Sequence, residues 1–189
     1  MTHFQGGFHP ANDPSRRVWQ NPEAILNGIG LKPGITLVDV GCGAGFFALP
    51  AARMVGPDGK IYGVDGNPDS ISPLVEQAGK EGLQNLVLTA GTAEDYIPCE
   101  NCTDFVFYGI ALHDFHDAAR VLANAAKILK PGGKLIDVDW KKQDLPIGPP
   151  SHIKFAPSHA AKIIREAGFI VLSIENSGEY HYQITAIKP

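Results

Sequence analysis

A glycine-rich segment directly after a short apolar stretch is the most informative feature of the chain. Thr36 to Val40 is an apolar run typical of a buried strand, and residues 41–45 read Gly-Cys-Gly-Ala-Gly. Alternating glycines tolerate positive φ and carry no Cβ, so a ligand can approach the backbone closely. A helix is expected from Phe46 to Val55, and its unpaired N–H groups attract an anionic group. The segment therefore predicts a ligand-binding loop that suits a carboxylate.

An acidic residue follows the next expected strand, where it can make a second contact to a ligand bound at the glycine loop. Asp65 ends the apolar run Lys60 to Val64, about 20 residues after Gly45. A carboxylate there can accept hydrogen bonds from ribose hydroxyls and repels a 2′-phosphate. The structural alternative is a turn or cap residue before Pro68. A nicotinamide-dependent oxidoreductase is a weaker interpretation, because Phe46 occupies the place of the third glycine of a dinucleotide motif.

Strand-like and helix-like stretches alternate along most of the chain, which predicts parallel strands joined by helices. Residues 169–174 and 180–187 break this rhythm, and Asn-Ser-Gly at 176–178 indicates a hairpin with an antiparallel last strand. We therefore expect an α/β, Rossmann-like fold with a seven-stranded mixed sheet and helices on both faces. The remaining expected strands are 36–40, 60–64, 86–89, 104–108 and 134–138, and the expected helices are 22–29, 46–55, 68–81, 118–129 and 157–167.

Five motifs in order carry a family resemblance. They are residues 38–45 (VDVGCGAG), 63–65 (GVD), 90–94 (AGTAE), 104–106 (DFV) and 129–135 (LKPGGKL). Together they resemble the class I S-adenosylmethionine (SAM)-dependent methyltransferases, especially those of type 11 or 25. The resemblance covers roughly residues 21–188 and implies SAM as the cofactor and S-adenosylhomocysteine as the product.

The resemblance also implies roles for individual residues. Asp39 would hold the glycine loop and the SAM amino group, and Asp65 would bind the ribose hydroxyls. The loop under the methionine part would be shaped by the three glycines, Gly41, Gly43 and Gly45. The other expected cofactor contacts are Gly66 and Asn67 beside the adenosine, Thr92, Ala93 and Glu94 at the adenine, and Tyr108 and Gly109 beside the methionine.

A polar cluster follows the fourth expected strand, at the edge of the sheet where ligands bind in such folds. It reads Leu-His-Asp-Phe-His-Asp at 112–117, and His113 is the candidate general base because its ordinary pKa lies near neutrality. Asp117 can simply cap the next helix. A metal site that uses this cluster and Asp139 is a weaker alternative, because the spacing matches no strong metal signature, and we predict no metal.

Three other features bear on the site. Trp140 and His152 frame an irregular stretch at 141–156, which we expect to border the acceptor pocket. The alternative for Trp140 is that it only packs under this loop. Residues 1–20 are expected to form an N-terminal arm, which Phe4, Phe8 and Trp19 make either a candidate lid or an arm tethered by ordinary packing. Cys99 and Cys102 form C-x-x-C without a second such pair, and we expect two free thiols there.

Bulk composition narrows the remaining choices. The chain has 189 residues, which suits a single domain over 1–189, and a formal net charge of −4 with no long basic run. We therefore expect no nucleic-acid partner, no membrane segment and a cytoplasmic protein. The acceptor is expected to be a small molecule, because no added recognition domain is present. The alternative is a non-catalytic SAM-binding regulatory module, since most of the motifs concern the cofactor.

Overall fold

A computed structural model describes residues 14–189. Its strands are β1 (Thr36–Val40), β2 (Lys60–Asp65), β3 (Leu86–Ala90), β4 (Thr103–Gly109), β5 (Leu129–Trp140), β6 (Ile170–Ser177) and β7 (His181–Ile187). Its α-helices are α1 (Pro14–Trp19), α2 (Pro22–Gly28), α3 (Ala48–Val55), α4 (Pro68–Lys80), α5 (Ala118–Ile128) and α6 (Pro157–Glu166), and two short 3₁₀ helices are η1 (Ala93–Asp95) and η2 (Leu112–Asp114).

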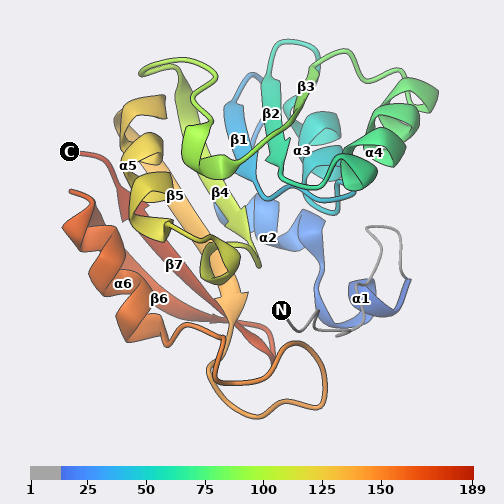
Figure 1. The fold of residues 1–189 in the computed structure, drawn as a ribbon. Coiled ribbons are helices and arrows are strands. Elements are labelled where there is room, and N and C mark those ends of the chain that lie inside the picture. The colour runs from blue at the N-terminus through green and yellow to red at the C-terminus, as the bar shows by residue number, and fades with distance from the viewer. Residues whose placement is uncertain (1–13) are drawn as a thin grey trace.

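The strands form one seven-stranded sheet in the order β3-β2-β1-β4-β5-β7-β6 (Figure 1). The pairs among β1 to β5 are parallel, and β7 runs antiparallel to both β5 and β6. The predicted α/β fold with an antiparallel last strand is confirmed. The hairpin does not simply extend the sheet, because β7 inserts between β5 and β6.

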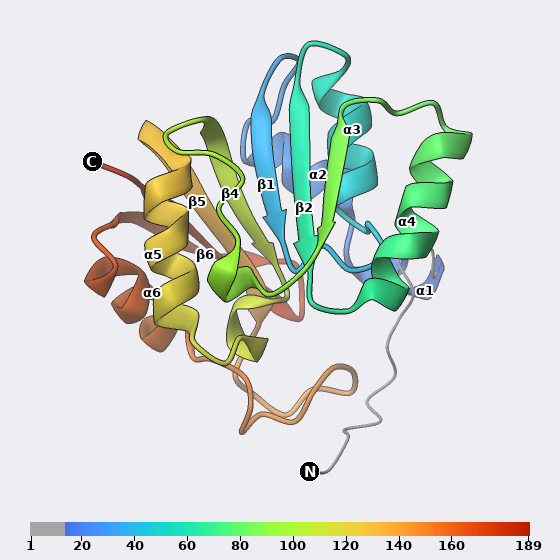
Figure 2. The ribbon, with the colours of Figure 1, turned by 45° about the horizontal axis from the view of Figure 1, so that its top comes forward.

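Two apolar cores lie on opposite faces of the sheet. Leu37 of β1 packs with α2, α3 and α4, whereas Val38 and Val40 pack with α5 and α6. This division follows from the strand geometry, in which successive side chains point to opposite faces. The carboxyl ends of the parallel strands meet at one edge, where α1 and the loop 141–156 also lie (Figures 1 and 2).

Side-chain caps explain where several helices start. Asn21 caps α2 by accepting a hydrogen bond from the Ala24 N–H at 2.9 Å, and Pro22 takes the first helical position. Asp117 likewise caps α5 through the Arg120 N–H at 2.9 Å. Helix α3 begins at Ala48 rather than at Phe46, because the loop continues through two further residues.

Residues 131–133, which lie between the expected helix 118–129 and the expected strand 134–138, are part of β5. Gly132 donates its N–H to the Lys188 carbonyl at 2.9 Å, and Lys188 donates back to the Gly133 carbonyl at 2.9 Å. These two hydrogen bonds keep the segment in register with the end of the chain.

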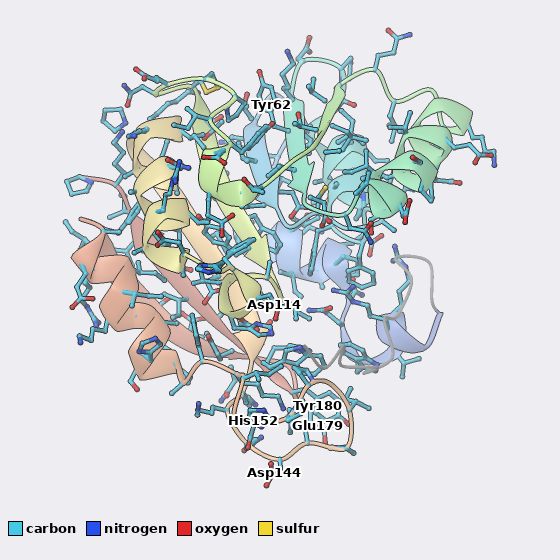
Figure 3. All side chains as sticks on the ribbon, viewed as in Figure 1. Tyr62, Asp114, Asp144, His152, Glu179 and Tyr180 are labelled. Carbon is cyan, nitrogen blue, oxygen red and sulfur yellow. A yellow bond between two sulfur atoms is a disulfide. The ribbon has the colours of Figure 1, made fainter. Side chains whose placement is uncertain are left out.

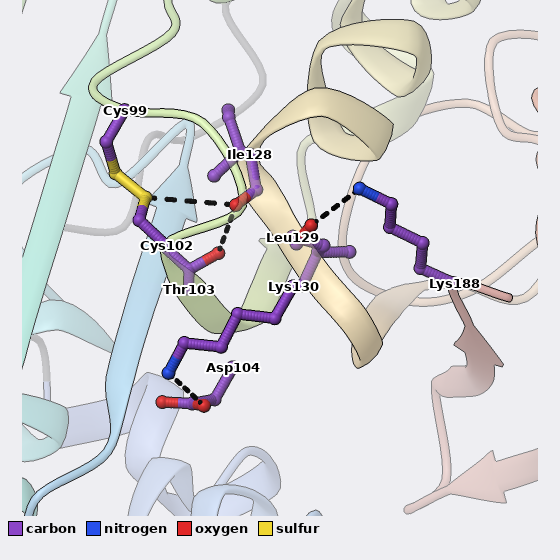
Figure 4. The surroundings of a disulfide bond; sticks show 8 residues. All are labelled: Cys99, Cys102, Thr103, Asp104, Ile128, Leu129, Lys130 and Lys188. Carbon is purple, nitrogen blue, oxygen red and sulfur yellow. Dashed lines mark hydrogen bonds and ion pairs between the residues drawn. A yellow bond between two sulfur atoms is a disulfide. The ribbon is translucent and has the colours of Figure 1, made fainter.

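The expectation of free thiols at Cys99 and Cys102 is wrong, because the two residues form a disulfide (Figure 4). A turn through Asn101, whose φ is 48°, brings the two Cα atoms to 6.0 Å, within the range that a disulfide spans. The Cys102 N–H donates to the Ile128 carbonyl at 2.9 Å, which ties the turn to the end of α5. Cys42 is a free, buried cysteine.

Within residues 14–189, the helices are too short or too polar to cross a membrane.

Candidate functional site

A cavity of about 830 Å³ opens at the carboxyl edge of the sheet. Its walls come from α1, the glycine loop after β1, the segment after β4, the end of β5 and the loop 141–156. A smaller recess of about 180 Å³ adjoins it and is lined by η1 and the ends of β2 and η2. Of the sequence-predicted residues, the cavity or the recess is lined by Asp39, Gly41, Gly43, Asp65, Gly66, Thr92, Ala93, Glu94, Gly109 and His113.

The three glycines of the loop have different surroundings. Gly41 has φ 78°, and a Cβ there would lie 2.7 Å from the Ala111 Cβ, so this position needs glycine for close approach to the segment after β4. Gly43, with φ 51°, faces open space in the cavity. Gly45 does not line the cavity, and a Cβ there would collide with Leu74 of α4. Only the first two glycines therefore shape the cavity surface.

Asp65 links the glycine loop after β1 to the segment that follows β2. Its Oδ2 accepts a hydrogen bond from the Gly43 N–H at 2.8 Å, and its Oδ1 accepts one from the Asn67 N–H at 2.9 Å. A carboxylate has about four lone-pair sites, so both oxygens can accept further hydrogen bonds from a ligand. Asn67 itself caps α4 through the Asp69 N–H and does not line the cavity or the recess.

Asp39 is a buried acid with an unused oxygen. Its side chain lies beside the glycine loop and is 1% exposed, and its Oδ2 has no hydrogen-bond partner among residues 14–189. Burial raises the pKa of Asp39 to about 7 and the charge of Asp65 adds to the rise, whereas the charge of Arg16 and a hydrogen bond from the Ala48 backbone N–H partly oppose it. A buried carboxylate oxygen without a donor is costly, so Oδ2 suits a cationic ligand group.

Helix α5 fixes the wall of the recess. The Asn124 side-chain amide donates to the carbonyls of Ala93 and Glu94 at 3.3 and 2.8 Å, which holds η1 in place. The Thr92 hydroxyl donates a hydrogen bond to the Asp95 carboxylate at 3.1 Å. Sequence reasoning missed Asn124, because it lies about 30 residues away on a helix with no recognisable motif.

Tyr108 does not reach the cavity. It is fully buried on the α5 side of the sheet, where its hydroxyl lies 3.5 Å from the Val121 carbonyl oxygen. Its neighbour Gly109 does line the cavity, and a Cβ there would lie 2.6 Å from the Phe47 ring. The alternation of side chains along β4 separates the two positions.

His113 is held between two carboxylates. Its Nδ1 lies 2.8 Å from the Asp139 carboxylate at the end of β5, and its Nε2 lies 3.2 Å from Asp114. The side chains of His113 and Asp139 are 3% and 1% exposed, whereas Asp114 is at the surface (Figure 3). Burial lowers the pKa of His113, but the hydrogen bond and charge of Asp139 outweigh it, so the pKa lies above its usual value.

The loop 141–156 supplies an apolar wall. Trp140 is buried beneath it, and Gly148 lies so close that a Cβ would be 2.9 Å from the indole ring. A hydrogen bond within the loop connects its two ends: the Lys154 ammonium donates to the Gln143 carbonyl at 3.0 Å. His152, expected at the pocket, is an exposed residue of this loop and does not line the cavity.

Helix α1 contributes two lining residues, Arg16 and Trp19. Trp19 belongs to the candidate lid expected from the sequence, whereas the sequence predicts no role for Arg16. Phe4 and Phe8 lie outside the described residues. In the part of the chain that the structure describes, no group of three or more His, Cys, Asp or Glu side chains is placed to hold a metal ion.

The comparisons with known proteins agree with this geometry. A family model described as a methyltransferase domain matches residues 31–182. A demethylmenaquinone methyltransferase of Staphylococcus aureus is 28% identical over 134 residues, which is 69% of this chain and 53% of that protein. The chain thus spans about half the length of the curated relatives it matches.

Solved structures resemble the chain over most of its length. A SAM-dependent methyltransferase from Aquifex aeolicus is 30% identical, has a TM-score of 0.89 and matches over 94% of both chains. Phosphoethanolamine N-methyltransferase 2 of Haemonchus contortus, solved with S-adenosyl-L-methionine, is 19% identical with a TM-score of 0.76, over 89% of this chain and 52% of that one. The second likeness concerns the fold alone.

Proposed function

The chain belongs to the SAM-dependent methyltransferases, and from this premise we propose that it methylates a small molecule, with His113 as the general base. The proposal places the cofactor at the glycine loop and the acceptor beside Trp140. One observation supports it: Asp39, which has an unpaired oxygen, and His113, which Asp139 holds by a hydrogen bond, line the same cavity of about 830 Å³.

The residues around the glycine loop fit SAM. The methionine part of SAM carries an ammonium group, which suits the unpaired Asp39 oxygen, and Gly41 and Gly43 leave the backbone open to it. Asp65 has lone pairs left for ribose hydroxyls, and the recess beside Ala93 is the candidate adenine site. SAM supplies a methyl group bound to a positively charged sulfur. The positive charge makes the sulfur a good leaving group when the methyl group is transferred.

With the donor activated, the protein contributes mainly alignment and proton removal. Asp139 holds the Nδ1 of His113, which leaves Nε2 as the atom that can take a proton from an acceptor. Asp114, which pairs with Nε2 and is mostly exposed, can give way to an acceptor group. The acceptor would pack on the wall made by Trp140, Ile147 and Ile153.

The size and character of the cavity favour a small acceptor. A volume of about 830 Å³ is in the range of small-molecule sites, and cofactor and acceptor must share it. One similar protein is named for a small molecule, demethylmenaquinone. The test is transfer of labelled methyl groups from SAM to the small-molecule, protein and RNA fractions of a cell extract. Label only in the protein or RNA fraction would contradict the proposal.

Replacing Asp65 by alanine should weaken SAM binding by about 10- to 100-fold, because hydrogen bonds to a charged group are worth roughly 1.5–3 kcal/mol. Calorimetric titration with SAM and S-adenosylhomocysteine measures the loss. Asp58→Ala is the matched control, since Asp58 is exposed in the turn before β2 and lines no part of the site. Equal affinity for the Asp65→Ala variant and the wild type would remove Asp65 from the proposed cofactor site.

A further inference from the structure

Arg16 is a cation built into the cavity wall. It extends from α1 into the cavity that Asp39 and the glycine loop also line. Its guanidinium carbon lies 3.7 Å above the centre of the Phe46 ring, and its Nε donates to the Gln20 side chain at 2.9 Å. Burial lowers the pKa of Arg16 to about 10, partly offset by Asp39, so the group stays charged at neutral pH.

The end of α1 is anchored on the last strands of the sheet, which fixes where Arg16 points. The Trp19 ring stacks on His181 with centroids 5.4 Å apart, and it lies 5.6 Å from Trp140. Gln20 is buried, and its N–H donates to the Arg16 carbonyl at 2.8 Å. These contacts make α1 a packed part of the site.

The guanidinium keeps donors for a ligand. Among residues 14–189, the Gln20 oxygen is the hydrogen-bond acceptor that Arg16 uses, and no acidic side chain forms an ion pair with it. Asp39 acts on it through its charge but is not a bonded partner. A partly buried cation without a bonded anion is costly, so an anionic ligand group would stabilise this arrangement.

We infer that Arg16 binds the carboxylate of the cofactor's amino-acid part while Asp39 binds its ammonium group. The inference rests on the proposed function, because it takes the cofactor to be SAM. The two side chains present opposite charges to one cavity, which matches the zwitterion of an amino acid. The planar guanidinium can also bind a carboxylate through two parallel hydrogen bonds.

The test compares two ligands that differ only in this part. S-adenosylhomocysteine carries the amino-acid group, whereas 5′-methylthioadenosine has the same adenosine and a neutral sulfur without it. Replacing Arg16 by alanine should weaken S-adenosylhomocysteine binding by about tenfold or more and leave 5′-methylthioadenosine binding within about twofold. Arg16→Lys should recover part of the loss, because the charge remains but the planar fork is gone.

Arg17→Ala is the matched control, since Arg17 is the exposed neighbour on α1, pairs with Glu23 at 2.9 Å and does not line the cavity. An equal loss for both ligands in Arg16→Ala would overturn the inference and make Arg16 a packing residue. Unchanged binding of S-adenosylhomocysteine in Arg16→Ala would overturn it as well. If the wild type binds neither ligand, the cofactor assignment itself fails, which is a distinct result.

Discussion

Replacing Asp39 by asparagine should make the ligand-free protein more stable while weakening SAM binding by about 100-fold or more. The carboxylate is 1% exposed and has an oxygen without a hydrogen-bond partner among the described residues, so its charge is costly in the empty site. The same charge is what the proposed function uses to bind the ammonium group of the cofactor. Removing one partner of a buried charge pair costs several kcal/mol, which sets the expected loss of affinity.

The pH dependence of this effect has a definite sign. Burial and the charge of Asp65 raise the pKa of Asp39 from 3.8 to about 7 in the folded protein. Between these two pH values the folded state holds a proton that the unfolded state has lost, so wild-type stability falls as the pH rises. Above about pH 7 both states are ionised and the penalty is constant, at most about 4 kcal/mol for this shift.

Chemical denaturation of the ligand-free wild type and Asp39→Asn between pH 4 and pH 8 measures the difference. The variant should be more stable by on the order of 2–4 kcal/mol at pH 8, and the gain should vanish toward pH 4. Asp58→Asn removes an exposed charge and should change stability by less than about 0.5 kcal/mol. A less stable Asp39→Asn at pH 8 would show that the carboxylate is satisfied in the empty protein.

The sheet and the glycine loop were predictable because their signals are local. Apolar runs bounded by Gly and Pro define β1 and β2, and Asp65 follows β2 at the expected distance. The residues that sequence reasoning missed reach the site from distant parts of the chain. Arg16 comes from a six-residue helix in a segment with weak periodicity. Nothing in its local pattern predicts that α1 packs against the ends of β5 and β7.

Two misplacements have physical explanations. The family resemblance implies that Tyr108 lies beside the methionine of the cofactor, although the alternation along β4 puts it with Val106 on the α5 side. The sequence predicts free thiols at Cys99 and Cys102, because their pairing depends on the turn through Asn101 and its hydrogen bonds to the end of α5, which residue spacing alone does not reveal. Such features depend on tertiary packing around a loop.

Replacing His113 by asparagine should lower kcat for the acceptor by about 10²- to 10⁴-fold, the usual contribution of a general base, if that acceptor must lose a proton. Binding of S-adenosylhomocysteine should change little, because no cofactor role is proposed for this side chain. The measurement is steady-state transfer to an acceptor found in the extract screen, together with calorimetry. An unchanged kcat with such an acceptor would assign His113 a structural role.

Asp139 should act by raising the pKa of His113 and not by contacting the acceptor. In Asp139→Asn the hydrogen bond and charge that outweigh burial are weakened, so the pKa of His113 should fall. A base must be neutral to accept a proton, so the wild-type rate should rise with pH through the elevated pKa of His113. The acid limb of the pH–rate profile should therefore move to lower pH in Asp139→Asn, and NMR titration of His113 should report the same direction.

A matched control lies two residues earlier on the same strand. Asp137 is fully buried, and burial followed by the charge of Asp139 raises its pKa well above the usual value, so it keeps its proton to higher pH. Asp137→Asn therefore removes little charge and should leave the pKa of His113 and the pH–rate profile near those of the wild type. If Asp137→Asn and Asp139→Asn shifted the profile equally, the effect would come from general loosening of β5.

The same linkage predicts how the pair affects stability. The folded-state pKa of His113 is raised, so its contribution is fully present below the ordinary value of 6.5 and is lost as the pH rises through the folded value. Asp139→Asn should therefore destabilise the protein most at pH 5–6 and less at pH 8. Asp39→Asn should have its largest effect at the alkaline end, so denaturation of both variants over one pH series separates the two buried acids. A loss in Asp139→Asn that did not change with pH would mean that His113 is neutral throughout, and the proposed base would need no activation by Asp139.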